Sequence, residues 1–188
     1  MAVEKQNKNG RLKLKQDLAK GSFETLYILY GEEAYLREYY LRQLRKKVVD
    51  ETFADFNLIE LDGKTLTLES LTEAVDSYPA MSEQKLVIVT DFNIYAPPAS
   101  FGDQLMDLLS DLPDYVCLIF YFDILEAKPD KRTKMYKLLE KKACTAEFAR
   151  LEEKELIERL ERRARELNCI ISDEDAAYMI FLCGTSLT

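Results

Sequence analysis

Five stretches of the chain have the apolar and aromatic character of β-strands. They cover residues 26–30, 56–62, 85–91, 115–122 and, with a weaker pattern, 144–149. Three of them contain nearly continuous apolar runs, which read "LYILY", "LVIV" and "VCLIFYF". Such unbroken runs are typical of parallel strands, because helices cover a parallel sheet on both faces. The pattern therefore predicts a buried parallel sheet.

Helical periodicity fills the segments between these strands. After the first strand, apolar residues recur every four positions at Leu36, Tyr40, Leu44 and Val48, as on one face of a helix. Comparable spacing marks three further segments, at Leu68, Leu71 and Val75, at Leu105, Leu108, Leu109 and Leu112, and at Tyr136 and Leu139. Strands that alternate with helices predict a doubly wound α/β domain with a five-stranded parallel sheet over residues 1–150.

The pattern changes after residue 150. The segment "LEEKELIERLERRARELN" places Leu156, Leu160 and Leu167 on one face of an amphipathic helix. In "SDEDAAYMIFLCG", Ser172 is a predicted N-cap and Gly184 a predicted stop. Because two helices bury little core by themselves, we expect residues 151–188 to begin a small all-helical domain of a longer protein.

Composition excludes several classes of function. The 188 residues carry a formal net charge of −8 and no histidine, the usual general base and metal ligand. The four cysteines are widely spaced, which favours reduced thiols in a cytoplasmic protein over a disulfide frame or a zinc site. No apolar run approaches the ~20 residues of a membrane span. The negative charge disfavours unaided wrapping of nucleic acid.

The turn after the first strand occupies the place of a phosphate-binding loop. The nucleotide motif G-x-x-x-x-G-K-[ST] uses glycine backbone N–H groups, a lysine and a hydroxyl to hold phosphate and magnesium. Counted from Gly31, its last three positions hold Leu36, Arg37 and Glu38. Leu36 would block the backbone, and Glu38 would place negative charge beside the phosphates. We therefore expect no nucleotide, cofactor or metal here, and no catalytic residue.

A single acid, Asp91, ends the third predicted strand. Phe92 follows it where a magnesium site would place a second carboxylate, so a turn residue or helix cap is the favoured interpretation. Two alternative classes remain open. One is an NTPase or kinase with an unusual phosphate loop. The other is a receiver or flavodoxin-like signalling domain, for which Glu32, Glu33 and Asp91 give a partial match.

Four segments, in this order, carry a family resemblance. They read "LYILYGEEAYL", "YPAMSEQKLVIVTD", "DKRTKMYKLLEK" and "ISDEDAAYMIFLCGTSLT". Together they resemble the delta subunit of bacterial DNA polymerase III, the clamp-loader subunit that opens the sliding clamp. The resemblance implies an AAA+-like first domain with a degenerate phosphate loop, then a three-helix lid and a collar. This sequence would hold the first domain and part of the lid. The implied partners are the sliding clamp (beta subunit), the other loader subunits and, through the complex, DNA.

The resemblance also implies a clamp-binding segment. The family grips the clamp with a hydrophobic wedge before the third strand, where this chain reads "SYPAMSEQ" over residues 77–84. The implied clamp-binding residues are Tyr78, Pro79, Ala80 and Met81. Methionine suits a partner's pocket because its unbranched side chain adapts to shape. Ala80 stands where the family has a bulky residue, which favours Tyr78 with Met81. The alternative is an ordinary turn whose methionine packs into the core.

A basic segment follows the fourth predicted strand. "KPDKRTKMYKLLEKK" carries seven cations, among them Lys131, Arg132, Lys134 and Lys137. These four are candidates for a contact with DNA or with an acidic partner subunit. The solvated face of a surface helix explains them as well and is the favoured interpretation.

Overall fold

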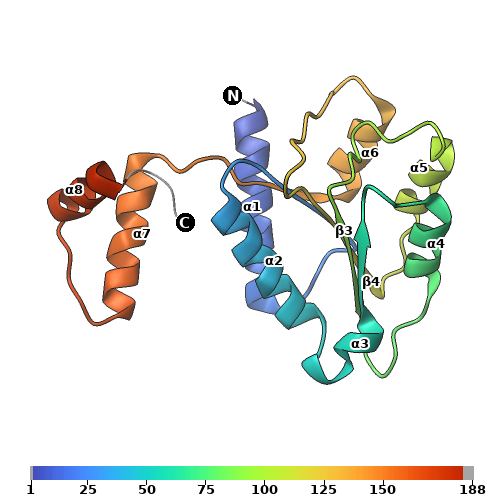
Figure 1. Cartoon of the computed structure of the whole chain (residues 1–188), viewed down its shortest axis with the longest axis horizontal. Helices are drawn as coiled ribbons and strands as arrows, with labels where there is room; N and C mark the ends of the chain where they lie inside the picture. Colours follow the sequence, from blue (N-terminus) through green and yellow to red (C-terminus); the bar gives the residue numbers. More distant parts are fainter. Residues whose placement is uncertain (1, 184–188) are drawn as a thin grey trace.

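The computed structural model, drawn in Figure 1, describes the backbone of residues 2–183 and the side chains of residues 10–183. These residues form one five-stranded sheet of the order β2-β3-β4-β1-β5, and every neighbouring pair of strands is parallel. The strands are β1 (Leu26–Tyr30), β2 (Leu58–Asp62), β3 (Lys85–Thr90), β4 (Val116–Tyr121) and β5 (Cys144–Glu147). The predicted α/β class and the predicted five-stranded parallel sheet are confirmed.

The strand order excludes the receiver-like alternative. Flavodoxin-like sheets have the order 2-1-3-4-5, in which the first strand lies between the second and the third. Here β1 lies between β4 and β5 instead. The partial match of the acids Glu32, Glu33 and Asp91 to a receiver therefore does not correspond to a receiver's topology.

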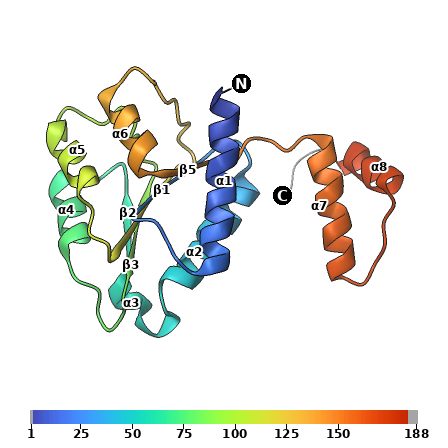
Figure 2. The same ribbon diagram turned by 180° about the vertical axis from the view of Figure 1, so that it is seen from behind.

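Helices cover both faces of the sheet, as Figures 1 and 2 show. One face carries α1 (Ala2–Lys20) and α2 (Ala34–Val48), and the other carries α4 (Leu68–Asp76), α5 (Gly102–Ser110) and α6 (Lys134–Lys142). Side chains alternate between the two faces along each strand. In β1, Tyr27 and Leu29 belong to the core on the α2 side, whereas Leu26 and Ile28 belong to the core on the α4 side.

Helix α1 is an element that the sequence analysis did not predict. Its Leu14 and Leu18, four residues apart, are buried in the core shared with α2. Gly10 lets α1 approach the edge strand, since a Cβ atom there would lie 1.8 Å from the backbone oxygen of Thr145. The helix thereby covers the outer edge of β5, which would otherwise expose unpaired backbone groups.

The second strand begins later than predicted. Residues 54–57 form a short helix, α3 (Ala54–Asn57), which follows a 3₁₀ turn, η1 (Glu51–Phe53), and β2 begins only at Leu58. The prediction of strand at Phe56 and Asn57 was therefore wrong. The reason is tertiary: the Asn57 side chain hydrogen-bonds to the backbone of Ala80, before β3. The other predicted strands match to within two residues at each end.

Two further helices, α7 (Glu153–Glu166) and α8 (Asp173–Cys183), pack against each other to one side of the sheet (Figure 1). Leu156 of α7 and Ala176 of α8 are buried. None of the helices between residues 2 and 183 combines the length and the apolar character that a membrane crossing requires. Within the same residues, His, Cys, Asp and Glu side chains nowhere gather in a group that could hold a metal ion.

Candidate functional site

The phosphate-loop position lies at the carboxyl end of the sheet, where ligands of open α/β sheets usually bind. Gly31 has a φ of 125°, and a Cβ atom on it would lie 2.4 Å from the backbone oxygen of Phe148. The backbone N–H of Glu33, which in a phosphate loop would be available to an anion, donates to the same Phe148 oxygen at 2.8 Å. Gly31 thus accommodates the segment that follows β5.

Arg37, at the lysine position of the motif, is used for internal contacts. It is 5% exposed, and its guanidinium donates to the backbone oxygen of Gly31 and, at 2.8 Å, to that of Asp123. The same group lies over the Tyr121 ring, 5.4 Å from its centroid. A buried guanidinium with these partners ties the start of α2 to the loop after β4. Leu36 beside it is 1% exposed and belongs to the core.

Asp91 also stabilises this end of the sheet. Its φ is 57°, and its Oδ1 accepts hydrogen bonds from the backbone N–H groups of Asp123, Ile124 and Leu125 at 2.8, 3.0 and 2.9 Å. Such a carboxylate acts as the anchor of a loop. The prediction that Asp91 is a turn residue is confirmed. At this end, the terminal nitrogens of Arg37, the carboxylate of Asp91 and the backbone N–H of Glu33 are hydrogen-bonded within the protein.

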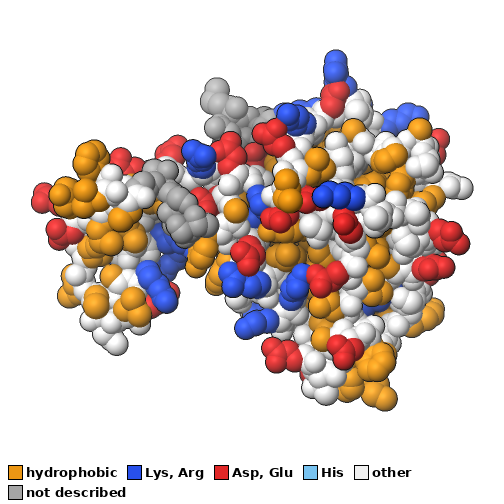
Figure 3. Space-filling model, viewed as in Figure 1, with side chains coloured by type: hydrophobic (Ala, Val, Ile, Leu, Met, Phe, Trp, Pro, Cys, Tyr) orange, Lys and Arg blue, Asp and Glu red, His pale blue; other side chains and the backbone are white. Residues whose placement is uncertain are grey.

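The amino end of the sheet exposes large apolar side chains. Tyr78 and Met81, which precede β3, are 82% and 86% exposed, and Phe56, which precedes β2, is 70% exposed. Figure 3 shows hydrophobic side chains gathered at the end of the molecule that carries α3. We call Phe56, Tyr78 and Met81 the apolar patch. Met81 thus lies outside the core, which excludes the alternative of a methionine packed inside.

Asn57 holds the turn that presents this patch. It is 0% exposed, its Nδ2 donates to the Ala80 backbone oxygen at 2.8 Å, and its Oδ1 accepts from the Ala80 backbone N–H at 2.7 Å. Ala80 and Pro79 are half-buried. Met81 follows in the left-handed region, with a φ of 52°, and such a backbone is uncommon outside glycine. Fixing the Ala80 backbone therefore directs the Met81 side chain outward.

The buried Lys85 also holds this turn in place, through hydrogen bonds to Ser77. Lys85 is 1% exposed, and its Nζ donates to the backbone oxygen of Ser77 and to its Oγ, the latter at 2.8 Å. Burial lowers the pKa of Lys85 to about 8. The Tyr115 ring lies 5.0 Å from that of Tyr78, and the Tyr115 hydroxyl donates to the backbone oxygen of Asp76 at 3.2 Å. These contacts hold residues 76–80 against β3 and β4.

Sequence reasoning missed Phe56, Asn57, Lys85 and Tyr115 as parts of this site. Phe56 and Asn57 were assigned to a strand, and Lys85 was taken only as the first residue of another. One signal was present: a lysine beside a continuous apolar strand needs polar partners once it is buried. The partner could not be read from the sequence, because Ser77 lies on the preceding turn.

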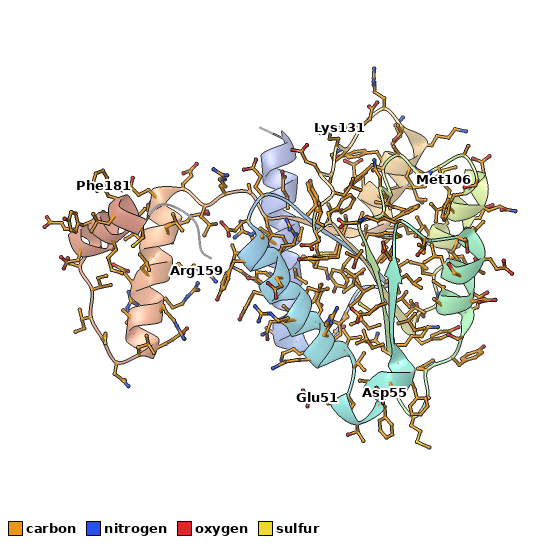
Figure 4. All side chains as sticks on the ribbon, in the orientation of Figure 1. Glu51, Asp55, Met106, Lys131, Arg159 and Phe181 are labelled. Carbon is orange, nitrogen blue, oxygen red and sulfur yellow. The ribbon has the colours of Figure 1, made fainter. Side chains whose placement is uncertain are left out.

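The basic segment lies far from the apolar patch. Lys131, Arg132, Lys134 and Lys137 are exposed, and Lys131 and Asp55 lie at opposite ends of the α/β domain in Figure 4. Arg132 forms an ion pair with Asp130 at 2.8 Å. Lys134 begins α6, whose buried residues Met135 and Leu139 face the sheet. The four cations thus occupy the outer surface of α6 and the loop before it.

Comparisons with known proteins agree with the fold and the sequence pattern. The family model described as DNA polymerase III, delta subunit, matches residues 27–149. The chain belongs to the DNA polymerase III delta subunit family. The DNA polymerase III subunit delta of Bacillus subtilis (strain 168) is 28% identical over 178 residues, which are 92% of this chain and 51% of that protein. The family predicted from the four sequence segments is confirmed.

A solved structure supports the same conclusion. The DNA clamp loader delta protein of Bacillus subtilis matches with a TM-score of 0.74 at 26% identity, covering 90% of this chain and 51% of that one. This match agrees with the α/β fold expected from the sequence. The chain spans about half the length of the relatives it matches.

Proposed function

We propose that this chain contains the clamp-binding part of a clamp-loader delta subunit, and that the apolar patch is its contact with the sliding clamp. The observation that supports this is the exposure of Tyr78 and Met81 on a turn that buried hydrogen bonds hold in place, with the exposed Phe56 of α3 at the same end of the sheet. Exposed apolar side chains gathered at one place mark a surface for a partner. A rigid turn also lowers the entropy lost on binding.

The proposed action is mechanical and needs no covalent chemistry. A sliding clamp is a closed ring that opens rarely by itself. A protein that binds the open ring more tightly than the closed ring shifts the population toward the open state by that difference in affinity. In the complete loader, other subunits would hydrolyse ATP, the assembly would act on DNA, and residues 151–188 would belong to a helical lid.

The energetic scale of the patch is adequate for this role. Burying one large apolar side chain against a partner contributes roughly 1.5–3 kcal/mol. A central contact of that kind carries much of an interface's binding energy. Tyr78 and Met81 are the members with the most exposed surface to lose. Pro79 and Ala80, half-buried, would shape the turn more than contact the clamp.

Binding to the purified bacterial sliding clamp, measured by calorimetry or surface plasmon resonance, tests the proposal. We expect Tyr78→Ala combined with Met81→Ala to weaken binding by about 30-fold or more. The matched control is Tyr178→Ala combined with Met179→Ala, the same two residue types exposed on α8, which should leave the affinity within about twofold. Equal loss in both variants, or no binding by the unaltered protein, would contradict the assignment.

Magnesium–ATP in the same experiment tests the remaining alternative, an NTPase with an unusual loop. We expect no binding, because Phe148 closes the space at Gly31 and the Arg37 guanidinium is already hydrogen-bonded to backbone oxygens. ATP binding with a magnesium requirement would revive that alternative.

A further inference from the structure

Four cations from two helices converge beside α2. Arg11 and Lys15 lie on α1, and Arg159 and Arg162 lie on α7. The Arg11 guanidinium lies over the Phe148 ring at 5.8 Å, and that of Arg159 lies over the Tyr35 ring at 5.7 Å. Figure 4 shows Arg159 between α7 and α2. We call these four residues the basic cluster.

The charges of the cluster act on one another. The pKa of Lys15 is lowered, first by burial and then by the positive charges of Arg11, Arg162 and Arg159, whereas Glu155 acts in the opposite direction. Among the side chains of residues 10–183, none of the four cations forms an ion pair. Like charges held near one another repel, and a bound anion would offset that repulsion.

Aromatic rings lie next to the cluster. Tyr35 and Tyr39, on α2, are 36% and 39% exposed. Behind them, Tyr40 contacts the Tyr39 ring edge-on and stacks on Phe148, in each case with 5.3 Å between ring centroids. Tyr39 is thereby supported from the protein side while part of its surface stays accessible. Cations beside accessible aromatic rings are the combination that binds single-stranded nucleic acid.

We propose that the basic cluster, together with Tyr35 and Tyr39, binds single-stranded DNA. The four cations contact backbone phosphates, and the tyrosine rings accept bases by stacking. Four positive side chains in one place stand out in a chain whose net charge is −8. Phosphate contacts and base stacking carry little sequence information, so binding should be largely independent of sequence. This goes beyond the proposed clamp contact, from which it is separate.

Fluorescence anisotropy of a labelled 20-nucleotide oligo(dT), titrated with the protein in 50 mM KCl, tests the proposal. Arg159→Gln with Arg162→Gln should weaken binding by about tenfold. The matched control is Arg163→Gln with Arg165→Gln, which makes the same charge change on the same helix but at residues paired with Glu166 and Glu161. The control should bind within about twofold of the unaltered protein. Equal weakening in both variants, or no binding by the unaltered protein, would overturn the proposal.

Three further measurements test the proposal without changing helix α7. Lys15→Gln, on α1, should weaken binding by about threefold. Raising KCl from 50 to 200 mM should weaken it by about 50-fold if four phosphate contacts are made, at a slope of about −0.7 per contact. Tyr78→Ala with Met81→Ala should leave oligo(dT) binding unchanged, which separates this site from the clamp contact. No effect of Lys15→Gln together with a flat salt dependence would overturn the assignment.

Discussion

The two ends of the sheet differ in how they use their polar and apolar side chains. At the carboxyl end, Arg37 and Asp91 are tied to backbone groups of the loop after β4, and Gly31 is closed in by Phe148. At the amino end, Tyr78 and Met81 are left in solvent on a turn held from beneath. The carboxyl end uses its polar side chains for internal hydrogen bonds, and the amino end exposes large apolar side chains to solvent.

Within this one domain, the residues that stabilise the fold and the residues exposed for binding thus lie at opposite ends of the sheet. Buried polar groups that have partners contribute to folding, and removing one partner leaves the other unsatisfied. Exposed apolar side chains contribute little to folding and much to association. Substitutions at the carboxyl end should therefore lower the free energy of unfolding with little effect on clamp affinity. Substitutions in the apolar patch should lower clamp affinity with little effect on the free energy of unfolding.

The largest expected effect is at Gly31. Gly31→Ala places a Cβ atom 2.4 Å from the Phe148 backbone oxygen, at a φ of 125° that side chains rarely adopt. We expect a loss of about 3 kcal/mol or more in the free energy of unfolding, from strain and from the displaced segment after β5. Denaturation in urea measures the change.

Gly21 supplies the control for this substitution. It also has a positive φ, of 69°, but a Cβ atom there would meet nothing within 4 Å. Gly21→Ala should therefore cost only about 1 kcal/mol, the price of the left-handed backbone. Similar losses at both glycines would mean that Phe148 does not close the carboxyl end.

A smaller loss is expected at Asp91. Asp91→Ala removes the acceptor of three backbone N–H groups and should lower the free energy of unfolding by about 2 kcal/mol. Asp91→Asn keeps one acceptor oxygen and tolerates the positive φ, so it should lose about half as much. Clamp binding by the folded variants should stay unchanged. A loss of affinity as large as that of the Tyr78 and Met81 double variant would show that the two ends are coupled.

The sequence was sufficient to predict the sheet because three of its five strands are nearly continuous apolar runs. Apolar periodicity did not reveal α1, whose sequence is mostly polar and whose side chains from residue 10 onward include Leu14 and Leu18 as a buried apolar pair. It failed also at Phe56, where an aromatic residue before a strand was assigned to the strand. In both places a tertiary contact, with the edge of β5 or with the turn at Ala80, decides the local structure.

The candidate site was predictable in part, for the same physical reason. The motif position of Arg37 showed that a phosphate loop was altered, but not that the guanidinium would bond to Gly31 and Asp123. The family resemblance pointed to Tyr78 and Met81. Their outward direction depends on the buried Asn57, twenty-three residues before Ala80. Patterns of residue type along the sequence can locate such segments, but they do not predict the tertiary contacts that orient the side chains.

The smallest expected effect concerns the buried charge beneath the apolar patch. Burial lowers the pKa of Lys85 to about 8 from its ordinary 10.5, partly opposed by the negative charge of Asp76. Between these two values the unfolded chain holds a proton that the folded chain has released, so stability rises with pH there. Below pH 8 both states are protonated, and the folded state carries the cost of the buried charge.

Lys85→Met removes this titration and keeps a long unbranched side chain. We expect the free energy of unfolding of the unaltered protein to rise, relative to the variant, as the pH goes from 8 to 10. Cys144, whose pKa is raised to about 12 by burial, titrates in both proteins, so comparing the two cancels its effect. Denaturation curves at several pH values measure the difference. A constant difference would mean that Ser77 and Asp76 fully compensate the buried Lys85 ammonium, and that the charged lysine supports the turn carrying Tyr78 and Met81 over this whole pH range.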